Sequence, residues 1–176
     1  MKISEFIFAK GKVVSLYGKS GSGKTSVSLQ LCKEITPCLY ISTEGVAYQA
    51  RVEKTLYPNT YFAEAETSIQ VVELIYSALT KTNVNLIVID TVNSIYRRNR
   101  EVKDLLFQLI NAKEVSNYYN IRFLLTWQVS MNNRVSGEVF MRFFSDDILR
   151  ITGKYIIGNL RECKIRINDK GVSGCL

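Results

Sequence analysis

The residues with the clearest chemical meaning form the octapeptide Gly-Lys-Ser-Gly-Ser-Gly-Lys-Thr. It matches the phosphate-binding pattern G-x-x-x-x-G-K-[ST], in which glycines let consecutive backbone N–H groups point at an anion. Lys24 can reach the β- and γ-phosphates of a nucleotide, and the Thr25 hydroxyl can ligate Mg²⁺. The sequence therefore predicts a site for ATP and Mg²⁺. The predicted nucleotide-binding residues of the loop are Gly18, Lys19, Ser20, Gly21, Ser22, Gly23, Lys24 and Thr25.

The segments on either side of the octapeptide have the character that such a loop requires. Residues 12–17 form an apolar run that predicts a buried strand, and residues 25–35 have helical spacing. A helix that begins at the loop adds the positive end of its dipole to the phosphate site. We favour this interpretation over the alternative, a glycine-rich turn that contains a lysine by chance.

Three polar residues that end predicted strands could complete the site. Asp90 closes the apolar run 86–89, where phosphate-loop enzymes carry an acid that holds Mg²⁺; the alternative is an aspartate that caps the next turn. Glu44 follows the strand 39–42 and could orient and deprotonate a water, although its spacing fits a solvent-exposed turn equally well. Gln128 could hydrogen-bond the γ-phosphate; the alternative is a side chain that hydrogen-bonds the unpaired backbone groups at a sheet edge.

Basic residues follow two of the same strands. Arg97, Arg98 and Arg100 come just after the Asp90 strand, and Arg134 lies in the polar loop 130–137. Loops at the carboxyl edge of an open α/β sheet are where ligands bind, and cationic loops suit a nucleic-acid backbone. The net charge of +7 favours the same class of partner. A solvated basic loop or a subunit contact remains the alternative.

Length and composition favour one domain. The chain has 176 residues, of which 47% are apolar, and it has no histidine, so a histidine-based triad or metal site is excluded. The four cysteines show no C-x-x-C spacing, which gives no indication of a zinc ribbon or a thioredoxin-type site. We expect Cys32 and Cys38 to be core thiols.

Glu5 and Lys10 interrupt the first apolar stretch, and no run approaches the length of a membrane span, so we expect a cytosolic protein.

Strands and helices alternate along the chain, which predicts an α/β sheet with a β-rich C-terminal end. The expected strands are 12–17, 39–42, 61–63, 86–90, 122–129, 148–152, 155–157 and 164–167. The expected helices are 25–35, 46–56, 68–80 and 102–119.

In this order, these segments resemble the ATPase core of the RecA/RadA recombinase family. The Thr-Glu-Gly after the second strand and the Gln before the polar loop are more specific than the phosphate-binding loop itself. The resemblance implies a RecA-like phosphate-loop NTPase core: a mostly parallel twisted sheet flanked by helices, with a C-terminal antiparallel β extension, as one domain over residues 1–176. The matching segments are Gly18–Thr25, Leu39–Gly45, Leu86–Val92, Leu125–Val129 and Ile165–Gly171.

The resemblance also implies roles for individual residues. Glu44 would activate the hydrolytic water, and Gln128 would couple ATP to a second DNA-binding loop, residues 130–137. The basic stretch at Arg97 matches the first such loop. Arg51 falls where the family places an arginine against the adenine ring, as a cation–π stack. The implied ligands and partners are ATP, Mg²⁺, single-stranded DNA, and a RadA-type recombinase or another paralog.

Several departures from the family pattern point to a short archaeal RadA paralog of the RadB kind. The match begins at the core, so we expect no separate N-terminal DNA-binding domain. Trp127 stands where RadA-like proteins usually have Asn, and the second loop is short. The proline-bearing segment that caps ATP from a neighbouring subunit is not recognisable near residues 153–161. Residues 6–9, Phe-Ile-Phe-Ala, fit the F-x-x-A motif by which recombinases dock on one another, but a buried first strand is the favoured interpretation.

The function predicted from this resemblance is an ATP-binding paralog that binds single-stranded DNA and modulates homologous recombination and DNA repair, with weak Mg²⁺-dependent ATP hydrolysis. One alternative is a KaiC-like regulatory adaptor that binds a nucleotide without needing catalysis. A small-molecule phosphotransferase is less favoured, because an arginine-rich acceptor lid is missing.

Overall fold

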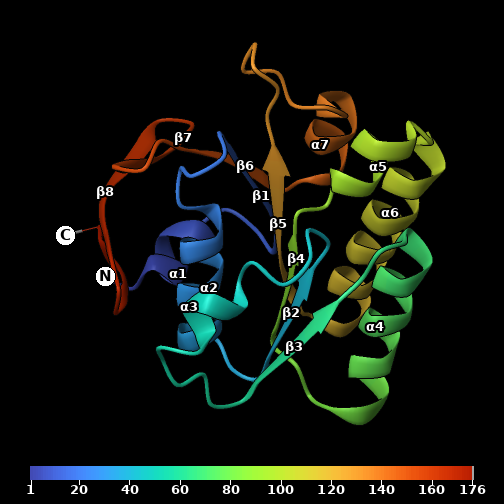
Figure 1. Ribbon diagram of the computed structural model, residues 1–176, viewed down its shortest axis with the longest axis horizontal. Coiled ribbons are helices and arrows are strands. Elements are labelled where there is room, and N and C mark those ends of the chain that lie inside the picture. Colours follow the sequence, from blue (N-terminus) through green and yellow to red (C-terminus); the bar gives the residue numbers. More distant parts are fainter. Residues whose placement is uncertain (176) are drawn as a thin grey trace.

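The computed structural model describes residues 1–175, which form one twisted sheet with helices on both faces (Figure 1). The strands are β1 (Val13–Gly18), β2 (Cys38–Ser42), β3 (Thr60–Glu64), β4 (Leu86–Asp90), β5 (Arg122–Gln128), β6 (Asp147–Ile151), β7 (Tyr155–Gly158), β8 (Arg161–Asn168) and β9 (Gly171–Gly174). The helices are α1 (Ile3–Ile7), α2 (Lys24–Glu34), α3 (Gln49–Val52), α4 (Ser68–Lys81), α5 (Ser94–Asn99), α6 (Val102–Tyr119) and α7 (Glu138–Phe144).

The order of the strands brings the predicted site together. It is β3-β2-β4-β5-β1-β6-β7-β8-β9, and every neighbouring pair from β3 to β6 is parallel. The carboxyl ends of these strands therefore share one edge of the sheet. The register sets Gly18 of β1 beside Gln128 of β5, and Ser42 of β2 beside Asp90 of β4. Four predicted strand ends thus meet at this edge.

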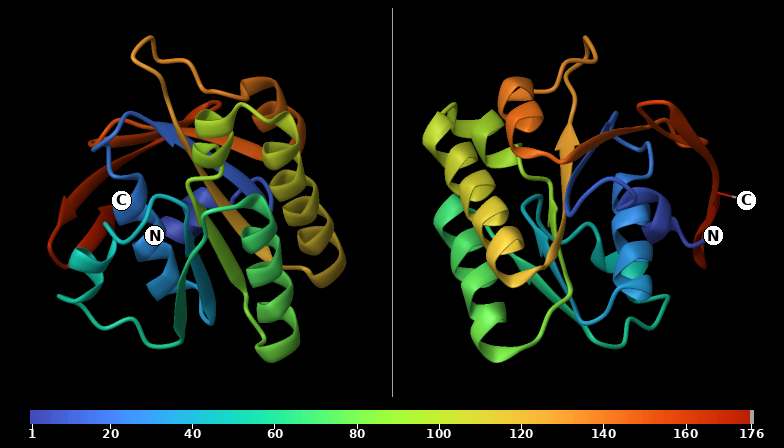
Figure 2. Two further views of the ribbon diagram at one scale, coloured as in Figure 1. Left: turned by 45° about the vertical axis from the view of Figure 1, so that its right-hand side comes forward. Right: turned by 180° about the vertical axis from the view of Figure 1, so that it is seen from behind.

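Two apolar clusters cover the two faces of the sheet. Helices α4, α6 and α7 lie on one face, and α1 and α2 lie on the other (Figures 1 and 2). Alternate residues of β5 serve the two clusters: Phe123, Leu125 and Trp127 pack toward α6, and Leu124 packs toward α2. Central strands buried on both faces explain the continuous apolar runs in the sequence.

The structure confirms the α/β class and the mostly parallel sheet, and it corrects some of the expected elements. The strand expected at 148–152 is β6, which pairs parallel to β1, so the antiparallel extension begins only with β7. The helix expected at 46–56 is limited to α3, Gln49–Val52. Val46 and Leu56 are exposed, so the apolar pattern of this segment gains no packing that would extend the helix.

Three short helices were not expected from the sequence. Residues 6–9 do not form a buried strand, because Phe6 and Ile7 belong to α1. Ile3, Phe6 and Ile7 have helical spacing and are buried together, which explains the helix. The other two are α5 and α7, which follow the ends of β4 and β5.

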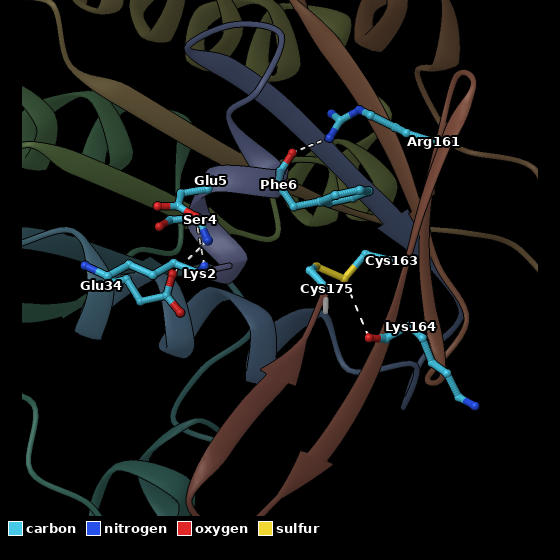
Figure 3. The surroundings of a disulfide bond; sticks show 9 residues. All are labelled: Lys2, Ser4, Glu5, Phe6, Glu34, Arg161, Cys163, Lys164 and Cys175. Carbon is cyan, nitrogen blue, oxygen red and sulfur yellow. Dashed lines mark hydrogen bonds between the residues drawn. A yellow bond between two sulfur atoms is a disulfide. The ribbon is translucent and has the colours of Figure 1, made fainter.

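The C-terminal part of the sheet, β7 to β9, curls round so that β9 packs beside α2 (Figures 1 and 2). A disulfide between Cys163 and Cys175 joins β8 to the residue that follows β9 (Figure 3). This pairing was not predicted. Cys32 and Cys38 are free and buried, as expected of core thiols. Over residues 1–175, no helix has the length and apolar character needed to cross a membrane.

Candidate nucleotide-binding site

The predicted phosphate-binding loop connects β1 to α2. Gly21 and Gly23 have φ of +77° and +103°, a conformation that favours glycine. The loop is also tightly enclosed, since a Cβ atom at Gly18 would lie 2.6 Å from the Ile151 carbonyl oxygen, and one at Gly23 would lie 2.4 Å from Ile167 Cδ1. Gly21 is therefore needed for the turn, Gly18 for the close approach of β6, and Gly23 both for the turn and for the close approach of β8.

Lys24 is held inside this loop. Its Nζ donates hydrogen bonds to the carbonyl oxygens of Gly18 at 2.7 Å and Lys19 at 2.9 Å. Burial lowers the pKa of Lys24, against the opposing attraction of Asp90 and Glu44. A partly desolvated ammonium group with nearby acids is a suitable partner for an anionic ligand.

Asp90 accepts hydrogen bonds from three hydroxyl groups. Thr25 and Tyr40 donate to its Oδ2 at 2.7 and 2.5 Å, and Thr126 donates to its Oδ1 at 2.6 Å. The carboxylate is thereby fixed against the Thr25 hydroxyl, as the predicted Mg²⁺ site requires. Tyr40 and Thr126 were not predicted as site residues. The signal in the sequence is a hydroxyl in the middle of each of two apolar strands.

Glu44 emerges at the same edge of the sheet as Asp90. Its carboxylate lies 3.3 Å from Gln128 Nε2 and 3.4 Å from the Thr91 hydroxyl. Gln128 Oε1 is in turn 3.5 Å from Lys24 Nζ. The side chain of Glu44 is exposed, so water can reach it. The three residues predicted to act on the γ-phosphate therefore form one connected group.

A buried residue that the sequence analysis did not select connects this group to the polar loop. Asn93 donates through Nδ2 to the carbonyl oxygens of Gln128 at 3.0 Å and Ser136 at 3.2 Å, and its Oδ1 accepts from the Gln128 N–H at 3.0 Å. It lies in the α5 region, where the sequence shows only a polar turn. Asn93 thus ties the end of β5, just before the loop 130–137, to Ser136 near the other end of that loop.

A second part of the site lies beside the loop. A cavity of about 470 Å³ opens next to Gly21 and Gly23. Arg51, the residue predicted to face the adenine ring, lines it and donates a hydrogen bond to Ser26 Oγ. The volume is in the range of small-molecule sites. The other lining residues include Lys54, Tyr57, Gly153, Ile167, Asn168, Asp169 and Gly171.

The residues present suit Mg²⁺ and a triphosphate. Mg²⁺ prefers hard oxygen ligands and is usually held by one or two protein groups together with substrate phosphates. The Thr25 hydroxyl and the Asp90 carboxylate are such a pair, only 2.7 Å apart. Within residues 1–175 no cluster of three or more His, Cys, Asp or Glu residues could form an all-protein metal site. The roles of the individual residues stay predictions.

The predicted DNA-binding arginines are not in equivalent places. Arg97 and Arg98 lie in α5 and not in a loop, which corrects the sequence interpretation, and Arg100 ends that helix. Arg98 Nη2 donates to the Glu66 carbonyl oxygen at 2.9 Å, so it also fastens α5 to the segment after β3. All three line a cavity of about 850 Å³ that Glu44 also lines.

Arg134 lies in the loop 130–137, which projects beyond the sheet as a hairpin (Figure 1). The bridge between Val129 and Val135 and a hydrogen bond from Ser130 N to Arg134 O at 2.8 Å shape the hairpin. Arg134 and Met131 are exposed. The other three predicted arginines lie at α5 and not in a projecting loop.

The F-x-x-A motif is not available for docking. Phe6 is only 8% exposed and lies under the guanidinium group of Arg161, 4.4 Å from the ring centre. Ile7 is fully buried. This segment therefore serves the core of its own chain.

Comparisons with known proteins agree with the fold. No protein-family model matches the chain. The DNA repair and recombination protein RadB of Methanosphaera stadtmanae is 24% identical over 80% of this chain. The chain spans 65% of that relative's length.

Two solved structures have similar folds. The RadB recombinase matches with a TM-score of 0.75 and 20% identity, over 97% of this chain and 96% of that chain. A KaiC-like protein from the archaeon Pyrococcus horikoshii OT3 matches with a TM-score of 0.74 and 14% identity, over 97% and 94%. These matches confirm the RecA-like fold, and with the sequence relative they confirm the resemblance to RadB-like proteins of the RecA/RadA family.

Proposed function

We propose that this RadB-like chain of the RecA/RadA family binds ATP with Mg²⁺, hydrolyses it slowly, binds single-stranded DNA, and modulates a RadA-type recombinase or another paralog in recombination and repair. The observation that carries the proposal is the convergence of Lys24, the Thr25–Asp90 pair and Glu44 at one edge of the sheet. The name of the RadB relative supports the setting in DNA repair.

Each residue of the site has a distinct task under this proposal. The loop N–H groups and Lys24 would bind the phosphates, and the cavity beside Arg51 would take the adenosine. Thr25 and Asp90 would hold Mg²⁺, which when bound neutralises phosphate charge. Glu44 would orient a water and accept its proton. Gln128, in contact with Glu44 and Lys24, would report the state of the γ-phosphate through Asn93 to the loop 130–137.

Slow turnover is part of the proposal. Glu44 is exposed and, within residues 1–175, forms no hydrogen bond or ion pair with an arginine, although Arg97, Arg98 and Arg100 line the same cavity. Arginine supplied to a phosphoryl-transfer site can raise turnover about 10³-fold or more. Addition of DNA or a partner protein should therefore raise the rate.

Two variants test the nucleotide site. Lys24→Ala should abolish binding of a fluorescent ATP analogue in an equilibrium titration, because it removes the cation inside the loop. Glu44→Gln should bind ATP with unchanged affinity but lose hydrolysis, because it keeps the shape and removes the base. Tight ATP binding by the Lys24→Ala protein would show that the nucleotide lies elsewhere.

DNA binding is tested by charge reversal. Arg134→Glu should weaken binding of a labelled single-stranded oligonucleotide and lower the slope of log affinity against log salt by about 0.7, since one phosphate contact is lost. Arg142→Glu is a matched control, because Arg142 is exposed on α7 and pairs with Glu138. Affinity that does not respond to salt would contradict contacts with the DNA backbone.

A second candidate function is an adaptor that needs bound ATP but not hydrolysis; a KaiC-like protein shares the fold. The Glu44→Gln variant separates the two. If the variant loses hydrolysis but still supports DNA repair in cells, the adaptor is favoured. If repair fails although ATP binding is intact, catalysis is required.

A further inference from the structure

The disulfide between Cys163 and Cys175 closes the last hairpin of the described chain (Figure 3). Cys163 lies in β8 and is only 2% exposed, whereas Cys175 is half-buried. Both line a surface cavity of about 750 Å³ that also borders α1. A small thiol can therefore approach the disulfide from outside, with Cys175 as the more accessible sulfur.

The strand that this disulfide secures has few other attachments. Among residues 1–175, β9 pairs with β8 alone, over four residue pairs. The hydrogen bonds that leave the hairpin here lead to α2, the helix of the phosphate loop: Val172 N donates to Gln30 Oε1 at 3.1 Å, and Lys33 Nζ donates to the Lys170 carbonyl oxygen at 2.9 Å. The disulfide thus holds one end of a short strand that otherwise packs on α1 and on α2, the helix of the nucleotide site.

The turn of the same hairpin forms a wall of the cavity proposed for the adenosine. Asn168, Asp169 and Gly171 line that cavity, as does Arg51. Ile167 lines it too and packs so closely on the loop that a Cβ at Gly23 would overlap its side chain. Lys33, which holds the turn, also lies 4.9 Å from the ring centre of Tyr57, another residue of the wall. An ordered hairpin is therefore part of an ordered cavity.

We propose that Cys163–Cys175 is a thiol–disulfide exchange site for a dithiol reductant, and that its reduction weakens nucleotide binding by loosening the β8–β9 wall of the cavity. The inference rests on the proposed binding of ATP at that cavity. Loss of the covalent tie lets β9 fray from β8, and the nucleotide must then order the hairpin as it binds. The oxidised protein is the state with the higher affinity.

The exchange transfers two electrons from the dithiol reductant to the protein disulfide and needs no further reactant. A thiolate of the dithiol attacks Cys175 Sγ, the disulfide bond breaks, and Cys163 leaves as a thiolate that takes up a proton. The second thiol of the reductant then attacks the mixed disulfide and releases Cys175 as a thiol. Two electrons pass to the protein, and the dithiol becomes an intramolecular disulfide.

The test compares the affinity of the full chain for a fluorescent ATP analogue in two redox states. One sample is oxidised with oxidised glutathione and the other is reduced with dithiothreitol, and alkylation with mass spectrometry counts the thiols in each. Reduction should raise the Kd about three- to tenfold. It should also speed amide hydrogen exchange in residues 164–175, while exchange in β1 and β5 stays unchanged.

Variants separate this disulfide from the buried thiols. The double variant Cys163→Ser/Cys175→Ser should have the Kd of the reduced protein under both conditions. Cys38→Ala should keep the full redox response, because Cys38 lies in the core and not in the hairpin. Circular dichroism checks that each variant is folded, and reduction of the wild type supplies the same comparison if the double variant is not.

Three results would overturn the inference. They are an equal Kd in the two redox states of the wild type, a redox response retained by the double variant, and a wild type whose Cys163 and Cys175 stay reduced in oxidised glutathione. Absence of ATP binding in the oxidised wild type is a different result, because it removes the proposed nucleotide site itself.

Discussion

The Tyr40 hydroxyl donates a hydrogen bond of 2.5 Å to Asp90 Oδ2, the oxygen that also accepts from Thr25. Tyr40 belongs to β2 and Asp90 to β4, so the bond joins two neighbouring strands at the predicted metal site. Tyr40 is 1% exposed, and its ring packs against Tyr48 and Phe62. The tyrosine therefore orients the carboxylate of Asp90 from the neighbouring strand, independently of the phosphate loop.

Tyr40→Phe should weaken the response of nucleotide binding to Mg²⁺. The ring and its packing remain, but Asp90 loses one of the donors that orient it, and outer-shell changes of this kind cost about tenfold in metal affinity. The Mg²⁺ concentration that half-restores ATP binding should rise by that factor, while binding in EDTA stays unchanged. Removal of the bond should also lower the free energy of unfolding by about 1–2 kcal/mol in urea titrations.

Tyr61→Phe is the matched control for this substitution, because Tyr61 lies on the edge strand β3 with its side chain half exposed. It should change neither quantity. An unaltered Mg²⁺ dependence in the Tyr40→Phe protein would mean that Thr25 and Thr126 orient Asp90 without help.

Asn93→Ala should disconnect the loop 130–137 from the end of β5. Asn93 is fully buried and makes three hydrogen bonds with backbone groups of Gln128 and Ser136. Truncation leaves buried polar groups without partners, which should lower the free energy of unfolding by about 2–3 kcal/mol. Hydrogen exchange in the loop should become faster, and ATP should no longer alter DNA affinity.

Asn85→Ala provides a comparison, since Asn85 is exposed and donates one hydrogen bond to the Thr36 carbonyl oxygen. Asn85→Ala should lower the free energy of unfolding by no more than about 0.5 kcal/mol. If both alanine variants lose equal stability and ATP still alters DNA affinity in the Asn93 variant, Asn93 has no role in coupling.

The sequence predicted the structure best where a short stretch of the chain has a strong local pattern. Apolar runs that end in Asp90 and Gln128 predicted both the central strands and the edge at which their polar ends meet. The phosphate loop required only local residues, since its strand, glycines and helix are contiguous. These features depend on short-range chemistry, which a single sequence displays directly.

The parts that escaped prediction depend on contacts between distant residues. In the sequence, Tyr40 looks like one more residue of an apolar strand. Its role as a hydrogen-bond donor to Asp90 depends on β4 lying beside β2. Asn93 gains its meaning only when β5 and the following loop lie next to β4. The pairing of Cys163 with Cys175 needs the β8–β9 hairpin, of which the sequence predicted only the first strand, at 164–167.

Gly23→Ala should damage both stability and nucleotide binding. The φ of +103° is strained for alanine, and the new methyl group would displace Ile167 from the loop. We expect a loss of about 1–3 kcal/mol in the free energy of unfolding and a large loss of ATP affinity. Gly45→Ala separates the two causes, because Gly45 has a φ of +78° but open space around it. Gly45→Ala should show the backbone cost alone, and equal ATP affinity in the two variants would contradict a tight fit at Ile167.

Stability should fall in alkaline solution in part through Tyr48. Burial and a hydrogen bond to Glu64 raise the pKa of Tyr48 from its ordinary value of 10.0 to about 12. Because the folded state holds the phenolic proton more tightly than the unfolded state, this contribution is fully present below pH 10. It is lost as the pH rises from 10 toward 12, where only the unfolded chain releases the proton readily.

Tyr48→Phe should remove this pH-dependent contribution while keeping the stacking on Phe62, whose ring lies 5.6 Å away at 13°. Urea unfolding at several pH values from about 8 to 11.5 should show the wild type more stable than the variant by a constant amount below pH 10, with the difference shrinking above it. Tyr118→Phe, at an exposed position of α6, should follow the wild-type profile throughout. A difference between wild type and Tyr48→Phe that persists unchanged to the highest pH would show that Tyr48 does not ionise with unfolding in this range.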